Sequence, residues 1–102
     1  AVKAGYDCVE FHCGHNYLPH SFLSPAFNHR EDAYGGTFEK RCKFPLDCIR
    51  AIRQSIPQDM PLLMRLDAQD DYLENGLTIE DVIAVLQAGK RGRSRCTGYL
   101  AW

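Results

Sequence analysis

Two short apolar runs along the chain predict strands. Residues 7–12 contain Cys8, Val9 and Phe11 with little polar alternation, and residues 60–67 form a second run with the sequence MPLLMRLD. Short runs of this kind are typical of strands that are covered on both faces, as in a parallel sheet. We therefore predict two buried strands, one at each of these positions.

A helix is predicted between the two strands. It is expected to begin near Phe44, to hold Pro45 in its first turn, where proline is tolerated, and to end before Pro57. Its apolar positions recur at helical spacing: Leu46, Ile49, Ile52 and Ile56. Charged residues occupy the other side, so one face of this helix is expected to cover a larger structure.

A second helix is predicted from Thr78 to Gly89. Thr78 and Asp81 stand three residues apart, as in a capping box, and glycine is a common helix terminator. The apolar stripe of this helix is formed by Ile79, Val82, Ile83 and Leu86. Its closing sequence AVLQAG, at 84–89, has a counterpart in AVKAG at 1–5, which is therefore expected to end another helix.

The alternation of strands and helices indicates an α/β fold with a parallel sheet and crossover helices. Two parallel strands need neighbours on both edges, and a complete barrel of eight such units takes about 250 residues. The chain of 102 residues is therefore expected to be a fragment of a larger α/β domain, with residues 1–89 forming the partial domain.

Residues 90–102 depart from this pattern. After the second helix the alternation requires another apolar strand, but the segment KRGRSRCTGYLAW begins with four basic residues in six. We expect an unstructured or truncated tail here, with a basic tail that binds acidic partners as the alternative.

The composition is that of an ordinary globular chain. Hydrophobic residues make up 45%, charged residues 25%, and the net charge is -1, which gives no electrostatic bias toward nucleic acid. There is no run of about 18 apolar residues and no basic-then-apolar N-terminus, so no membrane span is predicted and a cytoplasmic location is expected. The five cysteines form no C-x-x-C pair, which favours reduced thiols.

The segment between the first strand and Phe44, about 30 residues long, shows no strong periodicity. It nevertheless carries several large apolar residues: Leu18, Phe22, Leu23, Phe27 and Tyr34. A free linker would not carry so many, so we expect an ordered loop at the carboxyl end of the first strand. Parallel α/β enzymes keep their chemistry at that end of the sheet.

Four polar side chains are expected to meet at this edge. His12 ends the first strand and His15 and Tyr17 begin the loop, while Arg65 lies near the end of the next strand. Two imidazole N–H groups polarise a carbonyl oxygen, and a phenol delivers a proton while remaining protonated at neutral pH. An arginine stabilises negative charge on a cofactor. The set suits the reduction of an electron-poor double bond.

Two other interpretations of the histidines stay open on residue types alone. His12 and His15, with Cys13 or His20, would supply ligands to a metal ion, although no H-E-x-x-H or paired C-x-x-C motif supports this. Alternatively, the histidines are purely structural. As an alternative to the enzyme, the chain would then be a non-catalytic metal- or partner-binding fragment that uses His12 and His15.

Residues 5–44 carry a longer resemblance. The run GYDCVEFHCGHNYLPHSFLSPAFNHREDAYGGTFEKRCKF resembles the signature region of the old yellow enzyme family, the FMN-dependent NADH:flavin oxidoreductases. The family pattern is approximately H-x-A-H-G-Y-L, F-L-S-P, N-x-R-x-D-x-Y-G-G and E-N-R, and the resemblance covers about residues 5–89. It implies a TIM barrel that binds FMN non-covalently at its C-terminal mouth, with this chain similar to the fourth and fifth strand-helix units.

The resemblance also implies a role for each candidate residue. His12 and His15 correspond to the pair that binds the carbonyl oxygen of the substrate, and Tyr17 corresponds to the proton donor. Arg65 corresponds to the residue beside N1 and the C2 carbonyl of the flavin, with His12 also near the cofactor.

The reaction implied is the reduction of an activated C=C bond in a small molecule. NADH or NADPH reduces FMN, and flavin N5 passes hydride to the β-carbon of an enone, enal, nitroalkene or dienoyl thioester while Tyr17 protonates the α-carbon. The chain alone is expected to be inactive. Some larger relatives add an iron-sulfur cluster, whose motif lies beyond the barrel and has no counterpart here.

Three positions depart from the family pattern. Gly14 replaces the usual alanine, Asn16 the usual glycine, and Lys40 the usual asparagine. Asparagine tolerates a left-handed backbone better than most residues, so Asn16 is not expected to displace Tyr17. Four further motif residues are expected to form scaffold hydrogen bonds: Asn28, Arg30, Asp32 and Tyr34.

Overall fold

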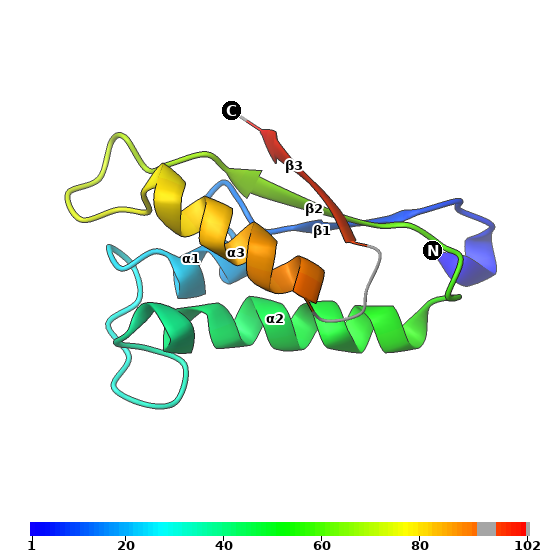
Figure 1. Ribbon diagram of the computed structural model, residues 1–102, viewed down its shortest axis with the longest axis horizontal. Helices are drawn as coiled ribbons and strands as arrows, with labels where there is room; N and C mark the ends of the chain where they lie inside the picture. Colours follow the sequence, from blue (N-terminus) through cyan, green and yellow to red (C-terminus); the bar gives the residue numbers. More distant parts are fainter. Residues whose placement is uncertain (92–95, 102) are drawn as a thin grey trace.

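The structure is a computed structural model that describes residues 1–91 and 96–101. Its elements follow one another as η1 (Val2–Ala4), β1 (Val9–His12), α1 (Leu18–Leu23), α2 (Phe38–Ser55), β2 (Leu62–Asp67), α3 (Ile79–Arg91) and β3 (Cys96–Ala101) (Figure 1). Strands alternate with helices as the hydrophobic pattern predicts, so the expectation of an α/β chain is confirmed.

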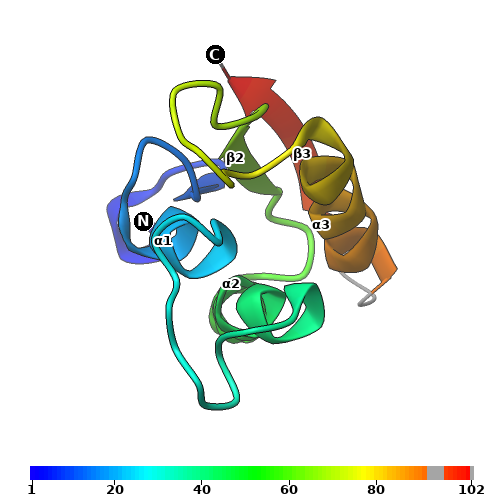
Figure 2. The ribbon, with the colours of Figure 1, turned by 90° about the vertical axis from the view of Figure 1, so that its left-hand side faces the viewer.

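The strands form one parallel sheet in the order β1-β2-β3. β1 pairs with β2 from Val9 opposite Leu62 to His12 opposite Arg65, and β2 pairs with β3 along its whole length. Helices α1, α2 and α3 lie on one side of this sheet (Figure 2). Because the strands are parallel, the carboxyl ends of β1 and β2 share one edge of the sheet, and the loop after β1 lies beside the end of β2 (Figure 1).

The side chains of β2 divide between two faces. Alternate residues are fully buried against the helices: Leu62, Met64 and Leu66. The intervening residues are half-buried: Leu63, Arg65 and Asp67. Leu63 and Arg65 project from the opposite face, whereas Asp67, at the strand end, reaches His20 of α1. Burial of each large apolar side chain stabilises the fold by about 1.5–3 kcal/mol. The helix side therefore holds the core, and the opposite face carries the polar side chain of Arg65 near the strand end.

The predicted start of α2 is wrong. The helix begins at Phe38 rather than near Phe44, and Oγ1 of its N-cap residue Thr37 accepts the Lys40 N–H at 3.4 Å. Pro45 therefore lies inside the helix, where it has no N–H to donate to the preceding turn. The first turn, where the sequence pattern predicts this proline, is the part of a helix in which proline costs least.

The capping box predicted for α3 is confirmed. Thr78 Oγ1 accepts the Asp81 N–H at 3.2 Å, and Asp81 Oδ2 accepts the Thr78 N–H at 3.3 Å. The helix runs on past Gly89 to Arg91, so the predicted terminator lies inside it. Gly5 does end an element: with φ 78 it closes the short turn η1.

The prediction of an unstructured tail is wrong for the residues that the structure describes. α3 continues to Arg91, and Cys96–Ala101 forms β3, which is paired in parallel with β2. The basic residues that argued against a strand precede β3, whereas the strand sequence itself contains threonine and tyrosine, which favour strands. The alternation of strand and helix thus continues. Residues 92–95 and 102 lie outside the described part of the chain.

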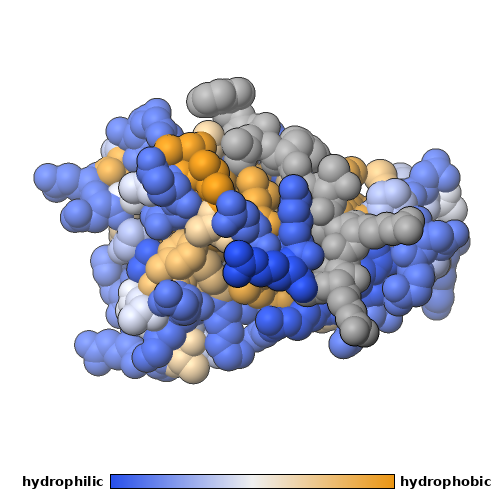
Figure 3. Space-filling model, viewed as in Figure 1, coloured by the Kyte–Doolittle hydropathy of each residue, from blue (hydrophilic) through white to orange (hydrophobic). Residues whose placement is uncertain are grey.

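Hydrophobic residues gather on the surface over α3 and between α3 and α2 (Figure 3). Ile83 of α3 is exposed, while Ile52 of α2 and Leu86 of α3 are partly buried against the core. Within residues 1–91 and 96–101 we find no helix with the length and apolar character that a membrane span requires.

Candidate active site at the carboxyl ends of β1 and β2

His12 and Arg65 occupy matching positions on neighbouring strands. His12 is the last residue of β1, and its register partner in β2 is Arg65. Val9 and Phe11 pack against the core on the helix side, so His12 projects from the opposite face, as Arg65 does. The imidazole and the guanidinium that the sequence predicts to meet are therefore neighbours on the sheet.

The hydrogen bonds of His12 and Arg65 leave donors unused. The Gly14 N–H donates to Nδ1 of His12 at 3.3 Å, so the neutral His12 ring carries its proton on Nε2. The Arg65 Nε is buried and has no hydrogen-bond partner among the described residues. Both groups can thus donate to a bound molecule.

A tight turn after β1 brings His15 and Tyr17 back toward His12. His15 and Asn16 both have left-handed backbones, with φ of 53 and 60, and the Tyr17 N–H donates to the Gly14 carbonyl at 3.1 Å. Asn16 thus adopts the left-handed backbone that asparagine tolerates, as expected, while its effect on the position of Tyr17 stays a prediction. Tyr17 is the N-cap residue of α1, but its side chain makes no capping hydrogen bond.

The three rings form a cluster at the edge of the sheet. The centroid of the His12 ring lies 5.0 Å from that of His15, with the planes at 87°, and 5.2 Å from that of Tyr17, with the planes at 66°. Tyr17 is 61% exposed, and His15 is exposed as well. The structure therefore gathers all four residues that the sequence nominates.

Asp67 is a member of this site that the sequence argument missed. Its Oδ2 accepts the His15 backbone N–H at 2.7 Å, and its Oδ1 lies 3.5 Å from Nε2 of His15. The signal was present in the sequence, because Asp67 stands two residues after Arg65 and strand side chains alternate. Its partner His15, however, lies in a different segment of the chain, so the sequence alone does not indicate the contact.

Behind Asp67 lies a buried histidine with a carboxylate beside each ring nitrogen. Nδ1 of His20 is 3.2 Å from Asp67 Oδ2, and Nε2 is 3.0 Å from Asp70 Oδ1. His20 is fully buried. Asp70 is held by Ser24, whose Oγ donates to it at 2.7 Å, and by the Leu77 N–H at 2.9 Å. The chain of contacts runs from the core to the exposed His15.

The metal interpretation of His12 and His15 gains no ligand set from the structure. Within the described residues, the one group of three side chains spaced to hold an ion is His20, Asp67 and Asp70, with ligand atoms within 4.8 Å of one another. Neither His12 nor His15 belongs to it. The two carboxylates also face different nitrogens of His20, and a single ion would take only one of these.

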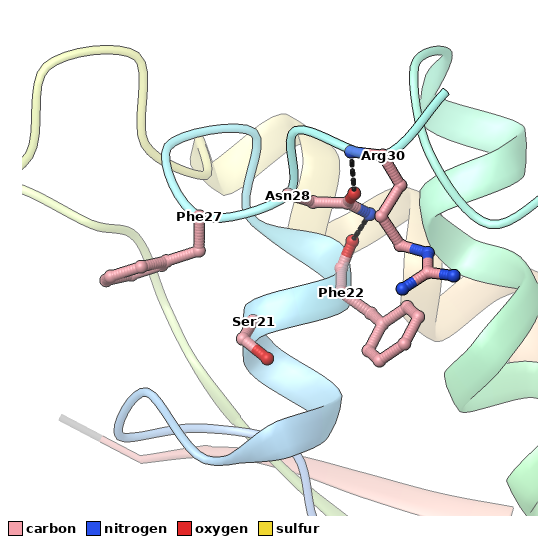
Figure 4. Close-up of a pocket in the computed structure, with 5 residues that line it drawn as sticks. All are labelled: Ser21, Phe22, Phe27, Asn28 and Arg30. Atoms are coloured by element: carbon pink, nitrogen blue, oxygen red, sulfur yellow. Dashed lines mark hydrogen bonds between the residues drawn. The ribbon is translucent and has the colours of Figure 1, made fainter. Parts of the chain in front are cut away.

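A separate cavity lies in the long loop (Figure 4). It has a volume of about 190 Å³ and is lined by Ser21, Phe22, Phe27, Asn28 and Arg30. Asn28 spans it, since Nδ2 donates to the Phe22 carbonyl at 2.7 Å and Oδ1 accepts the Arg30 N–H at 3.0 Å. Asn28 also donates to the Tyr34 carbonyl at 2.8 Å. The scaffold hydrogen bonds expected for Asn28 are therefore present. The four candidate active-site residues do not line this cavity: His12, His15, Tyr17 and Arg65.

Comparison with known families fits this geometry. The family model of the NADH:flavin oxidoreductase / NADH oxidase family matches residues 1–97. The chain belongs to this family. The resemblance to old yellow enzymes and the assignment to a TIM-barrel fold, of which the chain forms part, are thereby confirmed.

Individual members of the family are similar over most of the chain. An NADH:flavin oxidoreductase from Gibberella zeae is 49% identical over 70 residues, which are 69% of this chain and 17% of the relative. An NADPH dehydrogenase from Clostridium acetobutylicum is 38% identical over 88% of this chain and 26% of its own length. An NADH oxidase from Thermoanaerobacter brockii is 44% identical over 79% of this chain and 12% of its own. The chain thus spans about a quarter or less of these relatives.

A solved structure shows the same arrangement of elements. The complex of 2-naphthoyl-CoA reductase with 2-naphthoyl-CoA superposes with a TM-score of 0.86 and 31% identity, over 99% of this chain and 16% of that chain. At this similarity the two chains share the same fold over the superposed region. The roles of His12, His15, Tyr17 and Arg65 stay predictions from the family pattern.

Proposed function

We propose that the protein containing this chain is an FMN-dependent ene-reductase that uses NADH or NADPH to reduce activated C=C bonds in small molecules. The observation that carries the proposal is the ring cluster of His12, His15 and Tyr17, with centroids 5.0 and 5.2 Å from His12, beside the in-register Arg65. Relatives named NADPH dehydrogenase and NADH oxidase support the use of NAD(P)H.

The side chains at the mouth fit a flavin. Arg65 offers a permanent cation whose buried Nε has no partner among the described residues, which suits the anionic edge of a reduced flavin. His12 lies beside it in the neighbouring strand. These two residues would hold the pyrimidine edge of FMN, and the bound cofactor would supply hydride.

His12 and His15 would bind the carbonyl oxygen of the substrate. The proton on Nε2 of His12 makes that nitrogen a donor, because its Nδ1 is occupied by the Gly14 N–H. The His15 ring lies edge-to-face with that of His12, with centroids 5.0 Å apart and planes at 87°, so the two imidazoles are close enough to serve one ligand atom. Two such donors polarise the carbonyl and stabilise the negative charge that develops on its oxygen.

Tyr17 would protonate the α-carbon. Its phenol is exposed, and its backbone is fixed at the start of α1. The substrate gains one hydride at the β-carbon and one proton at the α-carbon, so the C=C bond becomes a C–C bond and the carbonyl is retained. Enones, enals and dienoyl thioesters all meet this requirement. The aryl thioester bound in the reductase structure supports the thioester class.

The test is the pair of half-reactions of the full-length protein. We expect it to purify with FMN, to be bleached by NADH or NADPH without oxygen, and to be reoxidised by 2-cyclohexenone or by an α,β-unsaturated thioester. A protein that binds FMN and accepts electrons from NAD(P)H but passes them to none of these acceptors would contradict the proposal.

A further inference from the structure

The carboxylate of Asp67 joins the exposed His15 to the buried core. One side of it accepts the His15 backbone N–H at 2.7 Å and faces the His15 ring, with Oδ1 3.5 Å from Nε2. The other side faces Nδ1 of His20 at 3.2 Å. Asp67 is largely buried, with 16% of its side chain exposed. It therefore contacts both the backbone and the ring of His15 from a fixed position.

The position of Asp67 is fixed from behind. His20 has no exposed surface, and its Nε2 lies 3.0 Å from Asp70 Oδ1, a close contact whose geometry is not that of a hydrogen bond. Asp70 in turn accepts hydrogen bonds from Ser24 and from the Leu77 N–H. Side chains that are buried and held by several partners lose few additional degrees of freedom when a ligand binds. Asp67 thus has the rigid support that a positioning residue requires.

Gly14 gives Asp67 the room to reach His15. A Cβ at position 14 would stand 2.5 Å from Asp67 Oδ1 and 3.0 Å from Asp67 Cγ, closer than carbon and oxygen atoms approach without displacement. This is the position at which the chain departs from the alanine of the family pattern. The Asp67 carboxylate can therefore occupy its position beside His15 only because residue 14 is glycine.

We propose that Asp67 is a positioning residue that holds His15 in place for binding the substrate oxygen, with Gly14 as the companion that admits its carboxylate. The proposal rests on the role assigned to His15 above. Asp67 fixes the left-handed backbone at His15 through the N–H bond and keeps the Nε2 edge of the ring turned toward itself. In this proposal Nδ1 of His15, for which no Asp67 contact is found in the described part of the chain, is the nitrogen that would bind the substrate oxygen.

The experiment measures ligand binding by the full-length, FMN-loaded protein without turnover. The probe is 4-chlorophenol. We expect its oxygen to take the place of the substrate oxygen and its electron-rich ring to give a long-wavelength charge-transfer band with oxidised flavin. The variants are D67A, D67N, H15A and the double variant H15A/D67A. D67N keeps an oxygen that accepts the His15 N–H, and it replaces D67A if the latter fails to fold.

We expect D67A to weaken phenol binding about tenfold, as for loss of one charge-assisted hydrogen bond, and D67N to weaken it only about threefold. Because Asp67 acts through His15, D67A should cause no further loss of phenol affinity in a protein that already carries H15A. Equal affinities of D67A and wild type, or a full additional loss in H15A/D67A, would overturn the proposal.

The same measurements separate this proposal from the proposed function. If H15A weakens phenol binding and D67A does not, the role of His15 stands and that of Asp67 falls. If the wild-type protein gives no charge-transfer band, or if H15A binds phenol as well as wild type does, the role of His15 itself is wrong and both proposals fall.

Discussion

His12 and Arg65 stand in register on β1 and β2, and the Arg65 Nε is buried without a hydrogen-bond partner among the described residues. A buried donor left unpaired costs free energy, and a bound molecule that accepts from it recovers that cost. The pairing of these residues therefore indicates where the anionic edge of a flavin would lie.

Replacement of Arg65 should weaken FMN binding. In the full-length apoprotein, Arg65→Ala removes both the charge and the donor, and we expect FMN affinity to fall about tenfold or more. Arg65→Lys keeps the charge and should have an intermediate effect. Quenching of FMN fluorescence during titration gives the affinities. Arg50→Ala is the control, since Arg50 lies exposed on α2, paired with Asp47 at 2.6 Å; an equal loss in this variant would argue against a specific role for Arg65.

Replacement of Tyr17 should separate the two half-reactions. Tyr17→Phe keeps the ring beside His12 and removes the hydroxyl, so reoxidation of the flavin by an enone should slow about 10²-fold or more while reduction by NAD(P)H stays nearly unchanged. Stopped-flow absorbance of the flavin measures both rates. Tyr6→Phe is the matched control, because Tyr6 is equally exposed, at 66%, and precedes β1. An equal loss in both half-reactions would exclude the proton-donor role.

The elements predicted best are those whose pattern is local. The predicted start of α3 at the capping box of Thr78 and Asp81 lies close to the observed one, and so does the predicted end of β2 at Asp67. Both were predicted because hydrophobic periodicity and capping residues involve positions that are close in the sequence. The start of α2 and the existence of β3 were missed for a related reason. Pro45 and the basic run before Cys96 are locally strong signals, but α2 begins earlier, at the cap formed by Thr37, and pairing with β2 includes Cys96–Ala101 in the sheet.

The residues of the candidate site likewise include four that local patterns reveal and one, Asp67, that they do not. His12, His15, Tyr17 and Arg65 were found because His12 ends a strand, Arg65 lies near the end of the next strand, the other two begin the loop, and the family pattern includes all four. Asp67 was missed because its function depends on a contact with His15 across 52 positions of the chain. No short pattern contains that contact, and only the register of β1 on β2 creates it.

Cys42 should make the stability of the fold depend on pH in the alkaline range. Burial in the core raises the pKa of its thiol to about 11, above the value of 9.0 for an unburied thiol. Below pH 9 both the folded and the unfolded thiol are protonated, so this stabilising contribution is fully present. As the pH rises from 9 toward 11 the unfolded chain loses its proton first, so the contribution is lost.

The measurement for Cys42 is urea unfolding of the full-length protein and of Cys42→Ala at several pH values. The difference in free energy of unfolding between them should shrink from pH 9 to pH 11. Iodoacetamide at pH 8 should modify the exposed Cys8 and spare Cys42 until urea is added. Rapid labelling of Cys42 in the native protein would show that the thiol is not buried.

Gly14 and Asp67 should be coupled in stability. Gly14→Ala places a Cβ 2.5 Å from Asp67 Oδ1, and overpacking of this kind costs about 1–3 kcal/mol. In the D67A background the carboxylate is gone and the same substitution should cost much less, although the backbone nitrogen of Asp67 at 3.2 Å remains a close neighbour. The four unfolding free energies, from urea denaturation of the full-length protein, form a double-mutant cycle.

Gly89→Ala is the control for that cycle. A Cβ at position 89, inside α3, would meet Ile49 Cδ1 at an ordinary 3.8 Å, with no closer side chain among the described residues. This substitution should be neutral or stabilise by about 0.5–1 kcal/mol, because alanine has less backbone entropy to lose in a helix than glycine. If Gly14→Ala costs the same with and without the Asp67 carboxylate, then the glycine is required by the backbone of the turn alone. The arrangement in which Gly14 admits Asp67 to His15 would then be wrong.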